Sequence, residues 1–152
     1  MHTTYLLKRY LCVAILTMIG LAALRLALEL VVDVQIGSAL GIVTAIVPAL
    51  DAGQTYGRRW EKRPENLYAW RMAAAFVALN FAAGLVLVLL TLSVTGGLGA
   101  FFDIVVSLGS LAMLGIMLVI FAIYLAASRY FFGYGAKLAL KVAQEEAGKN
   151  QP

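Results

Sequence analysis

The sequence predicts an all-α polytopic membrane protein with four transmembrane helices and a C-terminal interfacial helix. Of its 152 residues, 62% are hydrophobic and 13% are charged, whereas soluble domains are about 45–50% apolar and about 25% charged. A soluble chain of this size cannot bury so much apolar surface. The apolar residues also form long runs without the alternation of strands, and about 20 such residues let a helix cross a bilayer.

The four predicted spans are about residues 10–32, 36–54, 70–94 and 101–127, within a single membrane domain covering residues 1–152. The connection between the first two is very short, which predicts a tight helical hairpin. We expect the third helix to begin at Pro64, because proline suits the first helical position. Glycines in 95–99 predict a turn before the fourth span. In the tail, 128–152, Gly133 and Gly135 permit a bend that leads into the interfacial helix.

Lysine and arginine predict the orientation. Eleven of the twelve basic residues lie before the first span, between the second span and the first turn of the third, or after the fourth, and only Arg25 lies elsewhere. The positive-inside rule places those segments, and with them both termini, in the cytoplasm. Aromatic residues gather at the same boundary, as in an interfacial belt: Tyr56, Trp60, Tyr68, Trp70, Tyr130 and Tyr134.

The sequence offers no catalytic, cofactor-binding or metal-binding motif. Cys12 is the only cysteine and His2 the only histidine, which argues against a disulfide, a thiolate metal cluster, haem ligation and a Ser–His–Asp triad. Phosphate-loop, zinc-protease, hydrolase and calcium-loop patterns are absent. The net charge of +4 is spread over the segments between spans, so it does not indicate a nucleic-acid partner. We therefore expect no enzyme activity and no cofactor.

Arg25, Glu29 and Asp33 lie four residues apart and share one helix face. Ionisable residues in a span are candidates for binding or proton handling. Arg25, however, is about 24 Å along the helix from Arg9, near the opposite interface, where its side chain can reach water or pair with Glu29. We favour an interfacial ion pair and keep a binding role as the alternative.

A ladder of small residues at four-residue spacing runs along the second span and predicts close helix packing. Its members are Gly37, Gly41, Ala45, Ala49 and Gly53. Ala74, Ala78 and Ala82 form a shorter face of the same kind in the third span. We expect the two faces to pack together within this chain, with contact to another subunit as the alternative.

Two further polar residues lie in or at the end of spans. Asp51 follows Pro48, and we expect an interfacial carboxylate paired with Arg58 or Arg71. Asn80 lies deeper, where an amide usually bonds a neighbouring helix. Structural bonding is favoured over ligand binding.

The loop between the second and third spans is strongly basic, with Arg58, Arg59, Trp60, Lys62 and Arg63 as candidate contacts to lipid or to a partner. Each cation near an anionic membrane surface contributes about 1 kcal/mol. The basic residues are equally explained as determinants of membrane orientation, and contact with an acidic surface of a partner protein is a third possibility.

The stretch from Val47 to Tyr56 (Val-Pro-Ala-Leu-Asp-Ala-Gly-Gln-Thr-Tyr), followed by Gly57-Arg58-Arg59 and by Arg63-Pro64-Glu65, resembles a family of short four-span inner-membrane proteins of Gram-negative bacteria that has no characterised activity. Length and span number are similar too. The resemblance implies a bacterial inner membrane and transfers no catalytic residue.

From these features we expect a non-enzymatic membrane protein. It would be an accessory or assembly subunit that packs against other membrane subunits of a larger complex, for which a respiratory or photosynthetic complex is one candidate. Its expected partners are membrane lipids and integral membrane subunits. The alternative is a small transporter or channel, acting as a homo-oligomer; its polar candidates at mid-membrane are Thr44, Asn80, Ser107 and Ser110. A membrane-embedded enzyme ranks third.

Overall fold

The structure, a computed structural model, describes residues 2–32, 40–107 and 110–149, and all regular secondary structure in these ranges is α-helical. This confirms the predicted all-α class, whereas the C-terminal interfacial helix stays a prediction. The helices are α1 (His2–Val32), α2 (Leu40–Trp60), α3 (Asn66–Thr95), α4 (Leu98–Ser107) and α5 (Ser110–Lys149).

Within the described residues, three segments are long and apolar enough to cross a membrane: Thr3–Leu24 in α1, Asn66–Thr95, which is all of α3, and Met113–Gly148 in α5. They indicate a membrane-embedded protein. The second predicted span falls on α2, which is not among them over its described length. Asp51, Arg58 and Arg59 reduce the apolar character of α2, so a count of four spans stays a prediction.

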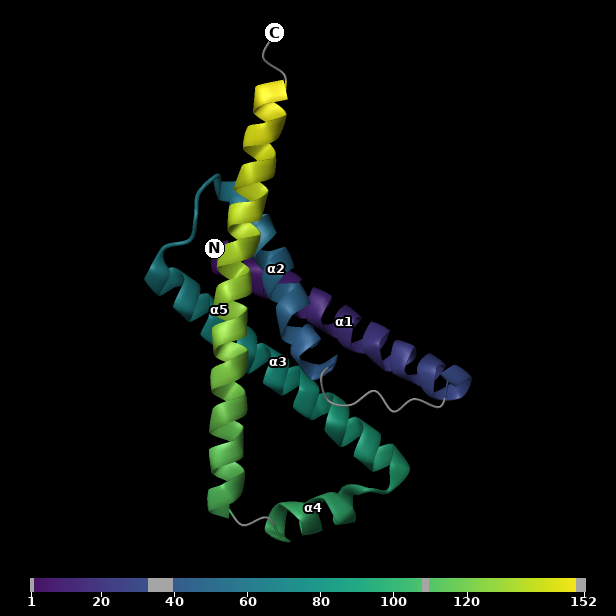
Figure 1. The fold of residues 1–152 in the computed structure, drawn as a ribbon. Coiled ribbons are helices and arrows are strands. Elements are labelled where there is room, and N and C mark those ends of the chain that lie inside the picture. Colours follow the sequence, from purple (N-terminus) through teal and green to yellow (C-terminus); the bar gives the residue numbers. More distant parts are fainter. Residues whose placement is uncertain (1, 33–39, 108–109, 150–152) are drawn as a thin grey trace.

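Helix α2 occupies the middle of the bundle (Figure 1). It packs most extensively against α5 and also contacts α1 and α3. A helix surrounded by protein on several sides does not need an apolar surface all round, which is consistent with the mixed composition of α2. Helix α5, with 40 residues, is about 60 Å long and extends past the rest of the bundle at the C-terminal end (Figure 1).

Glycines bring the backbones of α2 and α5 into direct contact. A Cβ atom added at Gly53 would collide with the carbonyl oxygen of Phe132, and one at Gly57 would lie 2.6 Å from the carbonyl oxygen of Ala136. From the other side, a Cβ at Gly135 would collide with the carbonyl oxygen of Leu50. Only residues without a side chain fit here, so these glycines set the distance between the two helices.

The packed core lies beside this contact and is rich in aromatic rings. Tyr10 of α1 stacks on Phe76 of α3, with ring centroids 4.1 Å apart. Phe76 meets Phe132 of α5 edge-on at 5.6 Å, and Phe132 meets Tyr56 of α2 at 5.8 Å. Such geometries are favourable for aromatic pairs beyond the area that they bury. One continuous cluster thus joins the four long helices.

At the other end of the molecule the helices diverge. Among the side chains that the structure describes, the last buried residue of α1 is Ala14 and the last of α3 is Asn80, while the first of α5 is Ser128. Beyond these points α3 and α5 separate, and α4 spans the gap between them (Figure 1). Gly96 makes the turn out of α3 with φ 72°, a left-handed conformation that glycine adopts without steric cost.

Three boundaries differ from the predictions. Helix α3 begins at Asn66 rather than at Pro64, with Glu65 in extended conformation before it. The predicted fourth span falls on two helices, α4 up to Ser107 and α5 from Ser110, and residues 108–109 lie outside the described residues. The predicted bend at Gly133 and Gly135 is wrong, because α5 continues through both residues as one helix. Gly135 instead allows the backbone of α5 to approach that of α2.

Candidate functional site

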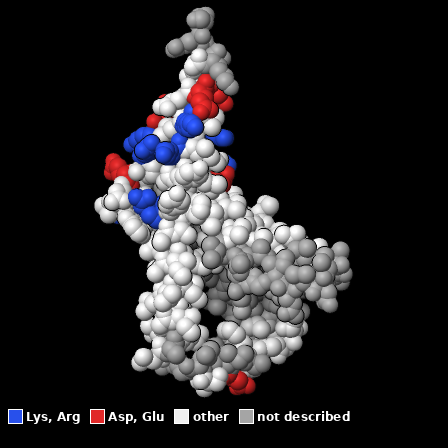
Figure 2. All heavy atoms as spheres, viewed as in Figure 1, with Lys and Arg blue, Asp and Glu red and all other residues white. Residues whose placement is uncertain are grey.

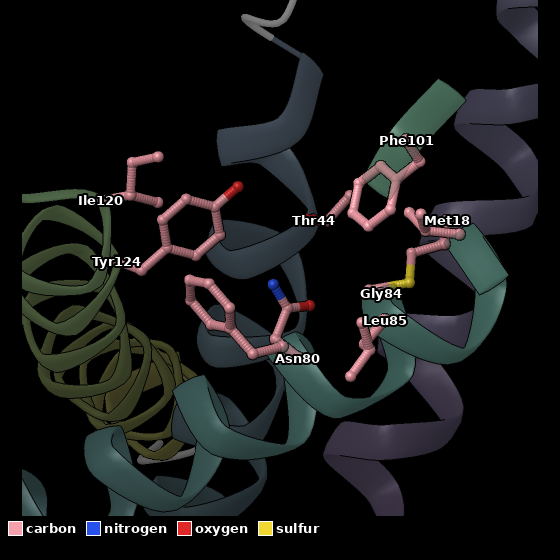
Figure 3. A pocket seen from close by; sticks show the side chains of 10 residues that line it. Met18, Thr44, Asn80, Gly84, Leu85, Phe101, Ile120 and Tyr124 are labelled. Carbon is pink, nitrogen blue, oxygen red and sulfur yellow. The ribbon is translucent and has the colours of Figure 1, made fainter. Parts of the chain in front are cut away.

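A cavity of about 380 Å³ lies where the packed core ends and the helices begin to diverge. All five helices contribute to its wall, as Figure 3 shows for most of the residues. The lining residues are Met18 of α1, Thr44 of α2, Asn80, Phe81, Gly84, Leu85 and Val88 of α3, Phe101 of α4, and Ile120 and Tyr124 of α5. The wall is therefore mainly apolar and aromatic, with few polar groups.

Asn80 is the most buried polar group of this wall, with 6% of its surface exposed. Its side-chain oxygen Oδ1 is buried and has no hydrogen-bond partner among the residues that the structure describes. In Figure 3 the amide points into the space bounded by Thr44, Phe101 and Tyr124. A buried polar atom without a partner costs about 1–3 kcal/mol, so this oxygen is an acceptor available to a further molecule.

Phe81 lines the cavity and connects α3 with α5 through ring contacts. Its ring meets Tyr124 edge-on at 5.6 Å and lies 6.1 Å from the ring of Phe121. The rim of the cavity is exposed: Leu85 and Ile120 have 57% and 39% of their surface accessible. Since both belong to helices apolar enough to cross a membrane, the cavity opens toward the hydrocarbon region.

The basic residues gather at the packed end of the molecule. Figure 2 shows Lys and Arg over α5 and the connection between α2 and α3, while most of the described surface toward the diverging end carries no charge. We call the packed, charged part the basic end and the diverging part the apolar end; the latter comprises residues 85–107 and 110–123.

Asp51 pairs with Arg9 of α1, not with Arg58 or Arg71 as predicted. The Nε and Nη2 atoms of Arg9 donate to Oδ2 and Oδ1 of Asp51 at 2.7 and 3.0 Å. This two-point geometry is the strongest form of a guanidinium–carboxylate contact. The pair fastens α1 to α2 and is partly exposed, so we assign it a structural role.

The predicted basic loop is partly helical. Arg58, Arg59 and Trp60 form the last turn of α2, whereas Lys62 and Arg63 lie in the connection to α3. All four basic side chains are exposed. The guanidinium carbon of Arg59 lies 4.8 Å from the centre of the Tyr5 ring of α1 and 5.8 Å from that of Trp60, favourable cation–π distances.

Tyr56, which the sequence places in an interfacial belt, belongs to the packed core. Its ring centre lies 4.8 Å from that of Trp60 and 5.5 Å from that of Tyr68. Burial raises the pKa of the Tyr56 phenol, which therefore stays neutral at physiological pH.

Part of the small-residue ladder is buried within this chain. Ala45, Ala49 and Gly53 are buried, and Gly53 abuts α5. The expected pairing with the third span is wrong, because Ala74, Ala78 and Ala82 are exposed.

Five of the residues predicted from the sequence lie where the structure does not describe their side chains or, for two of them, their backbone. Asp33 and Gly37 lie outside the described residues. Arg25, Glu29 and Gly41 lie on helices, but the structure does not describe their surroundings. The proposed Arg25–Glu29 pair stays a prediction.

Sequence reasoning missed the packing role of Gly57 and Gly135 and the aromatic wall around Asn80. Gly57 continues the four-residue spacing of the ladder by one further turn, so the signal was present. Gly84, one turn after Asn80, likewise marks the cavity face of α3. Tyr124 had no signal of this kind, because its approach to Asn80 depends on how α3 and α5 cross.

Comparisons with protein families, with curated proteins and with solved structures found no match to this chain. The resemblance to four-span inner-membrane proteins therefore stays an expectation.

Proposed function

We propose that this chain is a non-enzymatic accessory or assembly subunit of the bacterial inner membrane, which packs against other integral membrane proteins through its apolar end. The observation that carries the proposal is the exposure of that end. Six consecutive residues of α3, from Leu85 to Leu90, are each at least 40% exposed. Successive residues of a helix point in directions about 100° apart, so this stretch is uncovered on every side.

A helix that merely faces lipid has one exposed face and buries the other in its own bundle. At the apolar end, α3 and α5 are instead exposed on more than one face. Val94 at the end of α3 and Leu111 at the start of α5 are 87% and 89% exposed, although the same helices bury Phe76 and Phe132 fully at the basic end. Helices from another subunit would supply the missing neighbours and the dispersion contacts that go with them.

The basic end supports the predicted orientation. Exposed cations at this end favour the cytoplasmic side and attract anionic lipid headgroups. In this orientation the basic end anchors the protein while the apolar end is available within the bilayer for a partner.

The proposal is tested by site-specific crosslinking in the native membrane. A photo-reactive amino acid replaces Leu111 at the apolar end, and Val142, an exposed apolar residue at the basic end, serves as the matched control. We expect Leu111 to crosslink to another membrane protein that also co-purifies in mild detergent, and Val142 not to do so. Crosslinks only between copies of this chain would favour the oligomeric transporter. Crosslinks only to lipid, with a monomer in mild detergent, would overturn the accessory role.

A further inference from the structure

The geometry points to a ligand site in the Asn80 cavity for a membrane-soluble molecule that carries a hydroxyl group on an apolar, ring-containing body. This inference is independent of the accessory role, since a subunit or a transporter could hold such a ligand. It depends on the size of the cavity, on its wall and on Oδ1 of Asn80, an acceptor without a partner among the described residues.

The size of the cavity suits a small molecule. Ligand sites are usually about 300–1,000 Å³, mainly apolar, with a few polar groups that fix the orientation of the ligand. The Asn80 cavity, at about 380 Å³, lies at the lower end of that range. It is too small for a helix of another subunit, which is about 10 Å wide.

The wall selects the body of the ligand. Phe81, Phe101 and Tyr124 present aromatic rings, and Leu85 and Val88 complete an apolar surface. Aromatic groups pack favourably against such rings in offset or edge-on geometry. A charged or strongly polar ligand would lose its hydration here without compensation.

Asn80 selects the polar group of the ligand. Its Oδ1 atom accepts hydrogen bonds and does not donate them, and it has no partner within the described structure. Asn80 lies about 13 Å along α3 from Arg71, too deep for the headgroup region to satisfy it. A hydroxyl donor on a lipid-soluble molecule fits this position, whereas a pure hydrocarbon would leave the oxygen unpaired.

The opening determines the route of entry. Leu85 and Ile120 at the rim are exposed on helices that face the hydrocarbon region. The ligand would enter laterally from the bilayer, between α3 and α5.

The test uses photolabelling of the full chain in lipid nanodiscs. The probe is an aryl trifluoromethyl diazirine that carries a benzyl alcohol, and the matched probe has a methyl group in place of the hydroxymethyl group. Labelled peptides are identified by mass spectrometry. We expect the alcohol to label the cavity segments of α3 and α5 about three- to tenfold more than the matched probe, the range that one hydrogen bond supplies.

Two variants separate the ligand site from a role of Asn80 in folding. Asn80→Leu removes the acceptor and should abolish the preference for the alcohol. Gly84→Leu keeps Asn80 but fills the cavity; a Cβ at Gly84 meets no atom within 4 Å, so the variant should fold. Its control is Gly115→Leu, since a Cβ at Gly115 on α5 also meets nothing within 4 Å and Gly115 does not line the cavity.

We expect Gly84→Leu to lower cavity labelling by the alcohol at least fivefold and Gly115→Leu to leave it unchanged. Equal labelling by the two probes in the wild-type protein would overturn the inference, because it would indicate contact with bulk lipid only. Unchanged labelling of Gly84→Leu would overturn it as well. Loss of a co-purifying subunit in Asn80→Leu, with no preference for the alcohol in the wild type, would assign Asn80 to a subunit interface instead.

Discussion

The contact between α2 and α5 makes a quantitative prediction at Gly53. The variant Gly53→Ala adds one methyl group, whose carbon would collide with the carbonyl oxygen of Phe132 and lie 3.1 Å from the backbone nitrogen of Ala136. Both are backbone atoms of a regular helix and cannot rotate aside. The two helices must therefore move apart around this point.

The magnitude follows from the packing that this movement loses. Nonbonded carbons favour separations of about 3.5–4.0 Å, and a gap of about 0.5–1 Å forfeits a quarter to a half of each contact. Overpacking of this kind costs about 1–3 kcal/mol. Alanine also favours the helix over glycine by about 1 kcal/mol, which masks part of the cost. Gly20→Ala in α1 gains the same propensity, and a Cβ there meets nothing within 4 Å.

The difference between the two variants thus isolates the packing term, and we expect Gly53→Ala to be about 1–3 kcal/mol less stable than Gly20→Ala. The assay is SDS-induced unfolding in mixed micelles, followed by far-UV circular dichroism and by tryptophan fluorescence. Trp70 reports on tertiary structure, since Arg129 of α5 lies 5.7 Å from the centre of its ring. Equal free energies of unfolding for the two variants would refute the direct backbone contact.

Three further predictions concern the basic end and the orientation. In a double-mutant cycle of Asp51→Asn with Arg9→Gln, we expect a coupling energy of about 1 kcal/mol; a coupling near zero would show that the pair does not fasten α1 to α2. Phe76→Ala should lower the free energy of unfolding by about 3–5 kcal/mol, whereas Leu118→Ala, at a site that is 61% exposed, should change it by much less, and equal losses would contradict the division into a packed and an unpacked end. A reporter active only in the periplasm should be inactive when fused at Lys62 and active in the turn between α3 and α4, and periplasmic activity at Lys62 would reverse the proposed orientation.

Composition and apolar runs were sufficient to predict an all-helical membrane protein, because the bilayer requires every spanning segment to satisfy its backbone internally. Helix boundaries were less accessible to sequence reasoning. Gly133 and Gly135 resemble a flexible joint in the sequence, yet α5 passes through both. A glycine that loosens a helix and a glycine that admits a neighbouring backbone look the same until the neighbour is known.

At the candidate site, too, the sequence did not show which helices are neighbours. The sequence singled out Asn80 because an amide deep in an apolar span is costly unless it has a partner, but it favoured a structural bond to a neighbouring helix. Among the described residues, Oδ1 of Asn80 has no such partner. The pairing of Asp51 with Arg9 was missed, because Arg58 is closer in sequence and nothing local indicates that α1 crosses α2 at this level. Partners separated by 42 residues depend on the crossing of helices, which apolar periodicity does not specify.

The division between the two ends also explains how one small chain can be stable while its apolar end remains uncovered. The main contacts between the four long helices lie at the basic end. They are the backbone approach of α2 and α5, the ring cluster around Phe76, and the Arg9–Asp51 pair. Substitutions at the apolar end should therefore alter association or ligand binding without unfolding the protein. The Asn80 cavity lies at the boundary between the basic end and the apolar end. One side of it is formed by the packed core, and the other side by the exposed parts of α3 and α5, which a partner helix could cover. Closure of the apolar end by a partner helix would narrow the lateral entrance between Leu85 and Ile120, so partner binding and cavity occupancy should be thermodynamically coupled.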